Sequence, residues 1–442
     1  MHRVKYASAS SLARIVATTL FSSQAMAGGF QIDLDSVPLM SRAFAGSASA
    51  PDDAVVVNSN PAAMSMFTST TVQSAITAVD YSAKFTGGGH DAQGLPLTGG
   101  NGGDAGGTTP IPALQFIMPI GNGFTLGASV TSPFGLKTQY DPGWVGRYQA
   151  LTSELKTFDL TLAGAYQFNT VFSVGAGLIV QRADASLSKA IDFGAILASA
   201  GLAPAFLPQS ADGSSKVKGN DTALGWETGL LFHPQPSTSV GLNYRAKISH
   251  TIEGTADFTV PPPVQGVFTQ VGSPYFQDQA ASARVTTPAV ANFSITQMFS
   301  DRFSLSFDAQ RTQWDSTQEL RIKFAGPDPD SVEQFNWRNT TLLALGTDWK
   351  LSDTLTLRAG MARDQSPTND ANRDPSLPER NRQLYSIGLG WSTSKNASWS
   401  IGYMHIAVDK PTVNEVSPTG STLVGSFDAS VNILGFAGTL AF

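Results

Sequence analysis

The side chains that could carry out chemistry are few and lie far apart along the chain. Neither the H-E-x-x-H pattern of zinc hydrolases nor the G-x-S-x-G pattern of serine esterases occurs, and the chain has no cysteine. The sequence therefore predicts no catalytic residue, no metal site and no cofactor, so we do not expect an enzyme. The histidines are His2, His90, His233, His250 and His405.

Basic side chains are the groups that could hold a negatively charged ligand, because charge-assisted hydrogen bonds bind carboxylates strongly. A salt bridge to a facing aspartate or glutamate is the more common role for such a residue inside a protein, and we favour it here. The residues for which both roles stay open are Arg182, Arg245, Arg321, Arg358 and Arg382.

Two segments that predict long loops, 189–222 and 254–286, are unusually apolar. In the first, Phe193, Ile196 and Leu197 stand at nearly helical spacing, and Phe206 follows them. Such residues will partly pack against one another. Exposed apolar loops are nevertheless costly unless they bind something apolar, so we expect these residues to bind an apolar substrate.

Most of the chain alternates between apolar and polar residues with a period of two, which predicts β-strands. Phe158, Leu160 and Leu162 share one face, for example, and Asp159 and Thr161 share the other. We expect roughly a dozen or more strands of about ten residues between residue 72 and the end of the chain. Short turns alternate with long loops, as in a transmembrane antiparallel β-barrel, whereas periodicity alone would also fit a soluble β-sandwich or propeller.

Both ends of the chain carry features of an outer-membrane protein. Arg3 and Lys5 precede a short apolar run, Ile15 to Phe21, and Ala25-Met26-Ala27 matches a signal-peptide cleavage site. The last strand alternates up to the terminal Phe442, as expected for a strand that closes a barrel. We therefore expect a cleaved signal peptide and a place in the outer membrane of a Gram-negative bacterium.

Composition and patterning divide the chain into three parts. Only 14% of residues are charged, against about 25% in soluble proteins, and the net charge of −6 argues against nucleic-acid binding. We expect a signal peptide over 1–27, a segment over 28–68 that fills the lumen, and a transmembrane β-barrel with long extracellular loops over 69–442. The middle segment lacks alternation and is rich in small and apolar residues.

Several short motifs after the predicted cleavage site resemble the FadL family of outer-membrane long-chain fatty-acid transporters, which also contains aromatic-hydrocarbon channels. The resemblance extends over the whole mature chain and is most specific near its start. The motifs there are Gly29-Phe30-Gln31, Arg42-Ala43-Phe44-Ala45-Gly46, Asp52-Asp53-Ala54 and Asn60-Pro61-Ala62.

The resemblance implies an all-β barrel of about fourteen strands whose lumen is closed by an N-terminal hatch. The residues it assigns to this hatch or gate are Phe30, Arg42, Asn60, Pro61 and Ala62.

In this family an inward kink of the third strand makes a lateral opening in the wall, and the matching residues are Pro133, Phe134 and Gly135. Proline cannot donate to a strand ladder and glycine tolerates a bulge, so the sequence supports the kink independently. A plain turn at this position is the alternative.

The resemblance also places a basic residue of the binding pocket at Lys189, whereas a second basic position of the family falls on Glu333. This departure leaves the choice between a fatty acid and a neutral hydrocarbon open.

We expect passive uptake of long-chain fatty acids or other hydrophobic molecules, with capture by apolar loops and lateral release through the wall. A lipid-modifying barrel enzyme and a general diffusion porin are the alternatives. The expected partners are the hydrophobic substrate, outer-membrane lipid and lipopolysaccharide, and the barrel-assembly machinery, with no nucleic acid and with a monomer as the unit.

Overall fold

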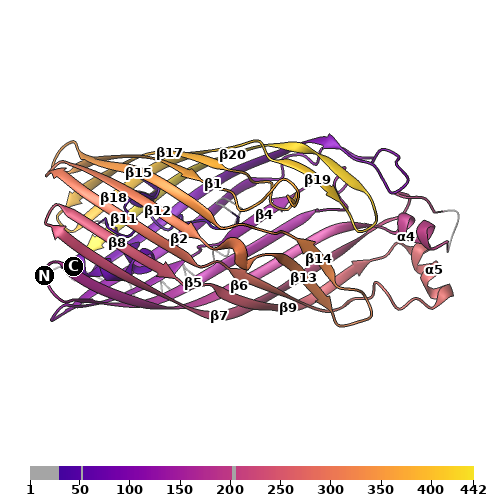
Figure 1. Cartoon of the computed structure of the whole chain (residues 1–442), viewed down its shortest axis with the longest axis horizontal. Helices are drawn as coiled ribbons and strands as arrows, with labels where there is room; N and C mark the ends of the chain where they lie inside the picture. The colour runs from indigo at the N-terminus through magenta and orange to yellow at the C-terminus, as the bar shows by residue number, and fades with distance from the viewer. Residues whose placement is uncertain (1–28, 51–52, 202–205) are drawn as a thin grey trace, which may run out of the picture.

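The structure is a computed structural model that describes residues 29–50, 53–201 and 206–442. The predicted signal peptide, residues 1–27, and Asp52 lie outside the described residues. The described strands form a single antiparallel sheet (Figure 1). The first strand, β1 (Thr71–Gly88), pairs along its whole length with the last strand, β20 (Thr422–Ala441). This pairing closes the sheet into a barrel, so neither strand is left as a free edge.

Twenty strand segments build fourteen wall strands, because six wall strands are each interrupted once. The other uninterrupted wall strands are β2 (Gly107–Gly121), β5 (Thr152–Gln167), β6 (Phe172–Asp192), β7 (Asp212–Gln235), β16 (Leu355–Asp364) and β17 (Arg382–Ser394). The interrupted ones are β3 (Phe124–Thr131) with β4 (Gly135–Gln139), β8 (Thr238–Arg245) with β9 (Ile248–Thr259), β10 (Gln279–Thr287) with β11 (Val290–Ser300), β12 (Phe303–Thr312) with β13 (Glu319–Phe324), β14 (Ser331–Gln334) with β15 (Thr340–Lys350), and β18 (Ala397–Val408) with β19 (Thr412–Val416). The prediction of an all-β barrel of about fourteen strands is confirmed.

The outer face of the barrel is apolar in a broad band. Leu162 is 58% exposed, Leu178 71% and Leu224 78%, although leucine is normally buried in proteins that are surrounded by water. The neighbouring residues in sequence, such as Asp159 and Thr161, face the lumen and are almost fully buried. This arrangement, apolar outside and polar inside, suits a wall that is surrounded by lipid.

Several wall strands are longer than the sequence pattern predicts. Strands β6, β7, β9 and β10 continue into the segments 189–222 and 254–286, which were predicted to be long loops. In these extensions the outward residues are polar, as at Lys216, Lys218 and Thr255. The apolar-to-polar alternation therefore disappears there although the strands continue, and hydrophobic periodicity cannot detect them.

The two ends of the barrel differ in their connections. At one end, which carries Phe442, short turns join the strands; at the other end, long loops include α4 (Phe193–Ala200) and α5 (Pro262–Val271) (Figure 1). None of the described helices is long and apolar enough to cross a membrane.

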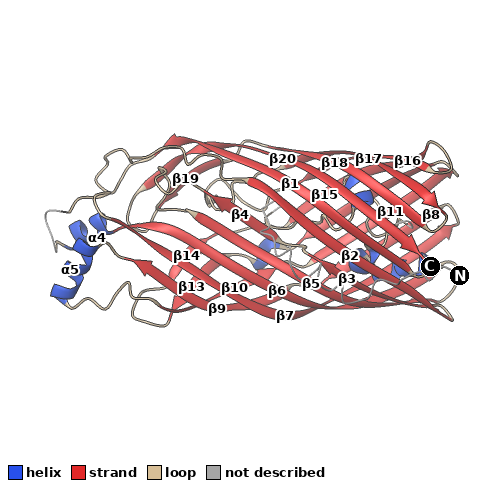
Figure 2. Ribbon diagram, turned by 180° about the vertical axis from the view of Figure 1, so that it is seen from behind, coloured by secondary structure: helices blue, strands red, loops and turns tan. Residues whose placement is uncertain are grey.

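The residues before β1 lie inside the barrel, where Figure 2 shows short helical turns enclosed by the strands. They comprise α2 (Val37–Ser41), α3 (Val56–Ser59) and η1 (Pro61–Met66). Ser36 caps α2 by accepting a hydrogen bond from the Leu39 amide at 3.1 Å, and proline occupies the first turn of both α2 and η1. We call residues 29–50 and 53–67 the N-terminal segment.

Candidate functional site

Asn60 fixes the N-terminal segment to the barrel wall. Its side chain is fully buried and donates to the carbonyl of Ala48 at 2.7 Å and to that of Leu230 on β7 at 3.1 Å. Its oxygen accepts from the Ala62 amide at 3.2 Å, so it also caps η1. The wall makes room for it with a glycine, because a Cβ on Gly229 would lie 1.8 Å from the Asn60 oxygen.

Charged wall residues also bind the N-terminal segment. Arg42, which is 1% exposed, lies 3.0 Å from Asp348 on β15. Asp308 on β12 accepts hydrogen bonds from the amides of Gly46 at 2.7 Å and Ser47 at 3.1 Å. Without the N-terminal segment these carboxylates would lose part of their compensation and keep only partners on the wall, such as Arg358 for Asp348 and Ser294 for Asp308.

The wall is incomplete beside β4. Strand β3 pairs with β2 over residues 124–130, but β4 has register partners on β5 alone among the described strands. Residues 132–134 separate β3 from β4, at the place where the sequence predicts a kink or a turn. Since β4 pairs again with the same neighbour, β5, the interruption is a kink within one wall strand.

The N-terminal segment covers this kink from the lumen side. The amide of Ile32 donates to the carbonyl of Pro133, and the amide of Gly135 donates to the carbonyl of Phe30, both at 2.8 Å. Gln31 and Phe134 therefore form one antiparallel bridge between these two bonds. Residues 30–32 thus act as a short added strand at the point where the wall is interrupted.

Aromatic side chains from four parts of the chain meet at this point. The ring of Phe30 lies 4.8 Å from that of Trp314, 5.7 Å from that of Trp337 and 5.9 Å from that of Phe134, measured between centroids. Trp314 begins the turn η2 (Trp314–Ser316), which separates β12 from β13. We call these four residues the aromatic cluster; together they bury an apolar surface directly behind the kink.

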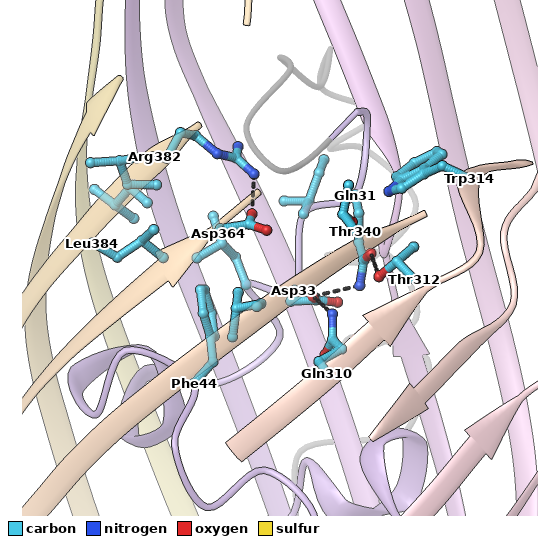
Figure 3. A pocket seen from close by; sticks show the side chains of 15 residues that line it. Gln31, Asp33, Phe44, Gln310, Thr312, Trp314, Thr340, Asp364, Arg382 and Leu384 are labelled. Atoms are coloured by element: carbon cyan, nitrogen blue, oxygen red, sulfur yellow. Dashed lines mark hydrogen bonds and ion pairs between the residues drawn. The ribbon is translucent and has the colours of Figure 1, made fainter. Parts of the chain in front are cut away.

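A cavity of about 20 Å³ adjoins the aromatic cluster, enough for roughly one water molecule (Figure 3). Asp33 projects toward it and accepts hydrogen bonds from Gln31 at 2.6 Å and Gln310 at 3.4 Å. An ion pair between Arg382 and Asp364 forms the opposite side. The lumen is therefore packed closely here, and a larger ligand needs the N-terminal segment to move.

Lys189 lies among carboxylates. Glu333 on β14, Asp374 in the loop after β16, and Glu415 on β19 each place a carboxylate oxygen within 4.8 Å of the other two. Lys189 on β6 is near enough to attract all three electrostatically. Burial raises the pKa of Asp374 although Ser376 donates hydrogen bonds to it. We call these four residues the Lys189 cluster; they combine one positive group with three acidic ones.

The apolar residues predicted to bind substrate lie apart from Lys189, at the tips of the long loops. Phe193 and Leu197 are fully buried between α4 and α5, where the Phe193 ring lies 4.9 Å from that of Phe276. Ile196 and Phe206 are half-buried against the same cluster. Much of the apolar area of these side chains is therefore used for packing, as the sequence analysis expects in part, and their role in binding substrate stays a prediction.

The arginines that the sequence left open all pair with nearby carboxylates. Arg245 pairs with Asp159, Arg358 with Asp348 at 2.7 Å, and Arg382 with Asp364. The two more exposed ones, Arg182 and Arg321, pair with Asp184 at 2.9 Å and Glu319 at 2.8 Å. The salt-bridge role that the sequence analysis favours is the one that these geometries support.

Sequence reasoning missed two components of this site. Trp314 and Trp337 belong to interruptions of the wall that carry no turn motif. Pro110 and Pro112 on β2 were also overlooked, although β2 is the strand that has no ladder with β4. Proline has no amide hydrogen to donate, so two prolines at alternate positions are a usable signal of a strand with an unpaired side.

A closed apolar-walled barrel with a filled lumen and an interrupted wall defines a class of outer-membrane transport barrels. The family described as "Outer membrane protein transport protein (OMPP1/FadL/TodX)" matches residues 18–442. The chain belongs to this family and is an outer-membrane protein, as predicted.

Three relatives illustrate the similarity. A long-chain fatty acid transport protein of Escherichia coli O6:H1 (strain CFT073) is 29% identical over 405 residues, covering 88% of this chain and 90% of that protein. The crystal structure of a Pseudomonas aeruginosa FadL homologue is 29% identical with a TM-score of 0.88, covering 94% of this chain and all of that one. The Pseudomonas putida toluene transporter TodX shares the fold, with 18% identity, a TM-score of 0.67, and coverage of 93% and 99%.

Proposed function

We propose that this protein takes up long-chain fatty acids or other long apolar molecules and releases them sideways into the outer membrane. The similarity to the Escherichia coli transport protein supports the substrate class. The observation that carries the mechanism is the kink between β3 and β4, where β4 has no ladder with β2 and where residues 30–32 occupy the inner side.

Lateral release is favourable for such a ligand. Each methylene that leaves water gains about 0.8 kcal/mol, and release into water would lose that gain again. Release into the bilayer loses almost none of it. For an alkyl chain, the free energy therefore falls along a path from the apolar loops, past the aromatic cluster and through the wall.

Displacement of residues 30–32 is the step that opens the path. Only two main-chain hydrogen bonds connect these residues to Pro133 and Gly135, and each is worth about 1 kcal/mol. A ligand that inserts among the aromatic rings can replace the contacts of Phe30. Phe30, Arg42, Asn60, Pro61 and Ala62 are in this proposal the gate and its anchor, and Pro133, Phe134 and Gly135 are the rim of the opening.

The Lys189 cluster decides what kind of head group is accepted. Lys189 alone could bind a carboxylate, but three acidic side chains surround it. This excess of acidic groups disfavours a free carboxylate and favours a neutral ligand or one that donates hydrogen bonds.

Replacing Glu333 by lysine is expected to raise the uptake of oleate about tenfold relative to that of hexadecane, since one charge-assisted hydrogen bond is gained and one repulsion is lost. Both labelled compounds would be supplied to cells that lack their own fatty-acid transporter. Glu253→Lys, on the exposed outer face of β9, serves as the matched control. An unchanged ratio in Glu333→Lys would contradict the role of the Lys189 cluster. If the unmodified protein takes up neither compound above the empty-vector level, the proposed function itself fails.

A second prediction concerns capture at the long loops. Leu207, Val271 and Tyr275 remain 57%, 48% and 44% exposed beside α4 and α5. Replacing all three by serine is expected to weaken the binding of oleate to cells in the cold without changing barrel stability, because these side chains are not packed. Phe193→Ser with Leu197→Ser is the comparison, and it is expected to unpack the two helices as well. Full capture by the exposed triple variant would argue against a loop binding surface.

The remaining expectations belong to the same proposal. Transport requires no catalytic group, so we propose a channel and not an enzyme. Outer-membrane lipid, lipopolysaccharide and the barrel-assembly machinery are proposed partners, and the unit is a monomer. A general diffusion porin is disfavoured by the packed lumen, where the N-terminal segment fills the space between the walls.

A further inference from the structure

A second discontinuity of the wall lies between β7 and the β8–β9 strand. Strand β7 pairs with β8 up to Glu227 and Arg245, and it pairs with β9 from Asn220 and Glu253 onward. Residues 221–226 of β7 have no register partner on β8 or β9, although they pair fully with β6 on their other side. One main-chain hydrogen bond crosses here, from the Ala246 amide to the Trp226 carbonyl at 2.9 Å. At about 3.3 Å per residue this seam is roughly 20 Å long.

Side chains close the seam where the main-chain ladder is missing. His250 is fully buried, and its ring nitrogens lie 3.0 Å from Asp221 on β7 and 3.0 Å from Gln181 on β6. The Thr251 amide donates to Asp221 at 3.2 Å in place of a carbonyl. The connection between the two strands therefore depends on the rotamers of His250 and Asp221.

Small residues on β7 let the side chains of β9 lie across the seam. A Cβ on Gly225 would stand 2.3 Å from the Cδ1 of Ile248, so Ile248 occupies the space above this glycine. Gln181, the partner of His250 on β6, pairs with Ala223 in the ladder. The His250 ring therefore reaches over β7 at its smallest residues, and a rotation of two side chains would uncover the seam.

The seam faces the membrane on its outer side and approaches the kink on its inner side. On the outer side, Leu224 is 78% exposed and Trp226 is 49% exposed, as in the lipid-facing band. On the inner side, Arg245 at the end of the seam lies 5.9 Å from the centre of the Phe134 ring. The wall is also interrupted between the β10–β11 strand and the β12–β13 strand. There, however, Trp314 and η2 fill the gap.

We propose that the seam between β7 and β9 is a second lateral passage, closed by His250 and Ile248, through which an alkyl chain moves between the lumen and the outer leaflet. This inference rests on the proposed function. Opening the seam breaks one main-chain hydrogen bond, from the Ala246 amide to the Trp226 carbonyl, whereas opening an ordinary pair of wall strands would break several such bonds. The passage accepts the same class of ligand as the kink, since the inner end of the seam, at Arg245, lies beside Phe134 of the kink.

The test measures oleate and hexadecane uptake by cells in which a disulfide between Gln31→Cys and Phe134→Cys holds the kink closed. In that background His250→Ala is expected to raise uptake about tenfold, because two side-chain hydrogen bonds that close the seam are lost. His405→Ala is the matched control. His405 bonds to Asn432 at 3.0 Å where the ladder between β18 and β20 is intact, so no change is expected.

A crosslink provides the converse test if His250→Ala fails to fold. Ala223→Cys with His250→Cys, joined by a short thiol-specific linker, is expected to lower uptake relative to the same protein without linker. A crosslink between Lys218→Cys and Thr255→Cys, which already pair in the ladder, should have no effect. Equal uptake with and without the seam crosslink, or no gain in His250→Ala, would overturn the second passage. Wild-type uptake at the empty-vector level would instead refute the proposed function.

Discussion

Uptake of oleate is expected to fall strongly when Gln31→Cys and Phe134→Cys are oxidised to a disulfide, and to recover after reduction. The two residues form an antiparallel bridge whose hydrogen bonds lie on either side of it. Cα atoms in such a pair are about 4.5 Å apart, which a disulfide accommodates. The bond would hold residues 30–32 against the kink and keep the opening covered.

The natural sequence has no cysteine, so no disulfide other than the engineered one can form in this experiment. Each single variant, treated with the same oxidant, controls for the loss of the Gln31 and Phe134 side chains. Heat-modifiable migration on gels reports that the barrel is folded. An oxidised double variant that transports as fast as its reduced form would show that residues 30–32 do not gate the kink.

Deleting residues 28–67 is expected to convert the protein into an ion-conducting pore. Barrels of eight strands are filled by their own side chains, whereas barrels of sixteen strands hold water. A fourteen-stranded wall without the N-terminal segment would admit water to its lumen. Asp308 and Asp348, which now contact that segment, would then face water. Planar-bilayer recordings should show steady conductance that the full-length protein lacks.

Asn60→Ala is a milder test of the same proposal as this deletion. It removes the hydrogen bonds to Ala48 and Leu230 but keeps the N-terminal segment, so brief openings are expected in place of a steady current. The loss of two buried hydrogen bonds corresponds to about 1–3 kcal/mol. A folded deletion variant that conducts no ions would refute the proposal that this segment closes the lumen.

The wall was predictable because its physical signal is local. Alternation at Phe158, Leu160 and Leu162 gives the strand and its lipid-facing side without any knowledge of the neighbours. The kink was also visible, since Pro133 and Gly135 interrupt a strand by their own backbone properties.

Features that depend on the neighbouring strand were not predictable. The seam lies inside β7, where residues 221–226 look like any other strand and only the register of β9 reveals the gap. The Lys189 cluster joins residues from β6, β14, β19 and the loop after β16, which are far apart in the sequence. Such groupings arise from the closed topology, which single-sequence patterns do not encode.

The pairing of β1 with β20 has a consequence for how this protein is made. Thr71 pairs with Ala441, so the first and last strands meet only after the whole chain has been synthesised. Contacts between such distant residues form slowly, because loop closure must precede them. The N-terminal segment precedes β1 and is enclosed by the finished ring. It is synthesised before every wall strand, so it is available to pack against the wall while the ring closes around it.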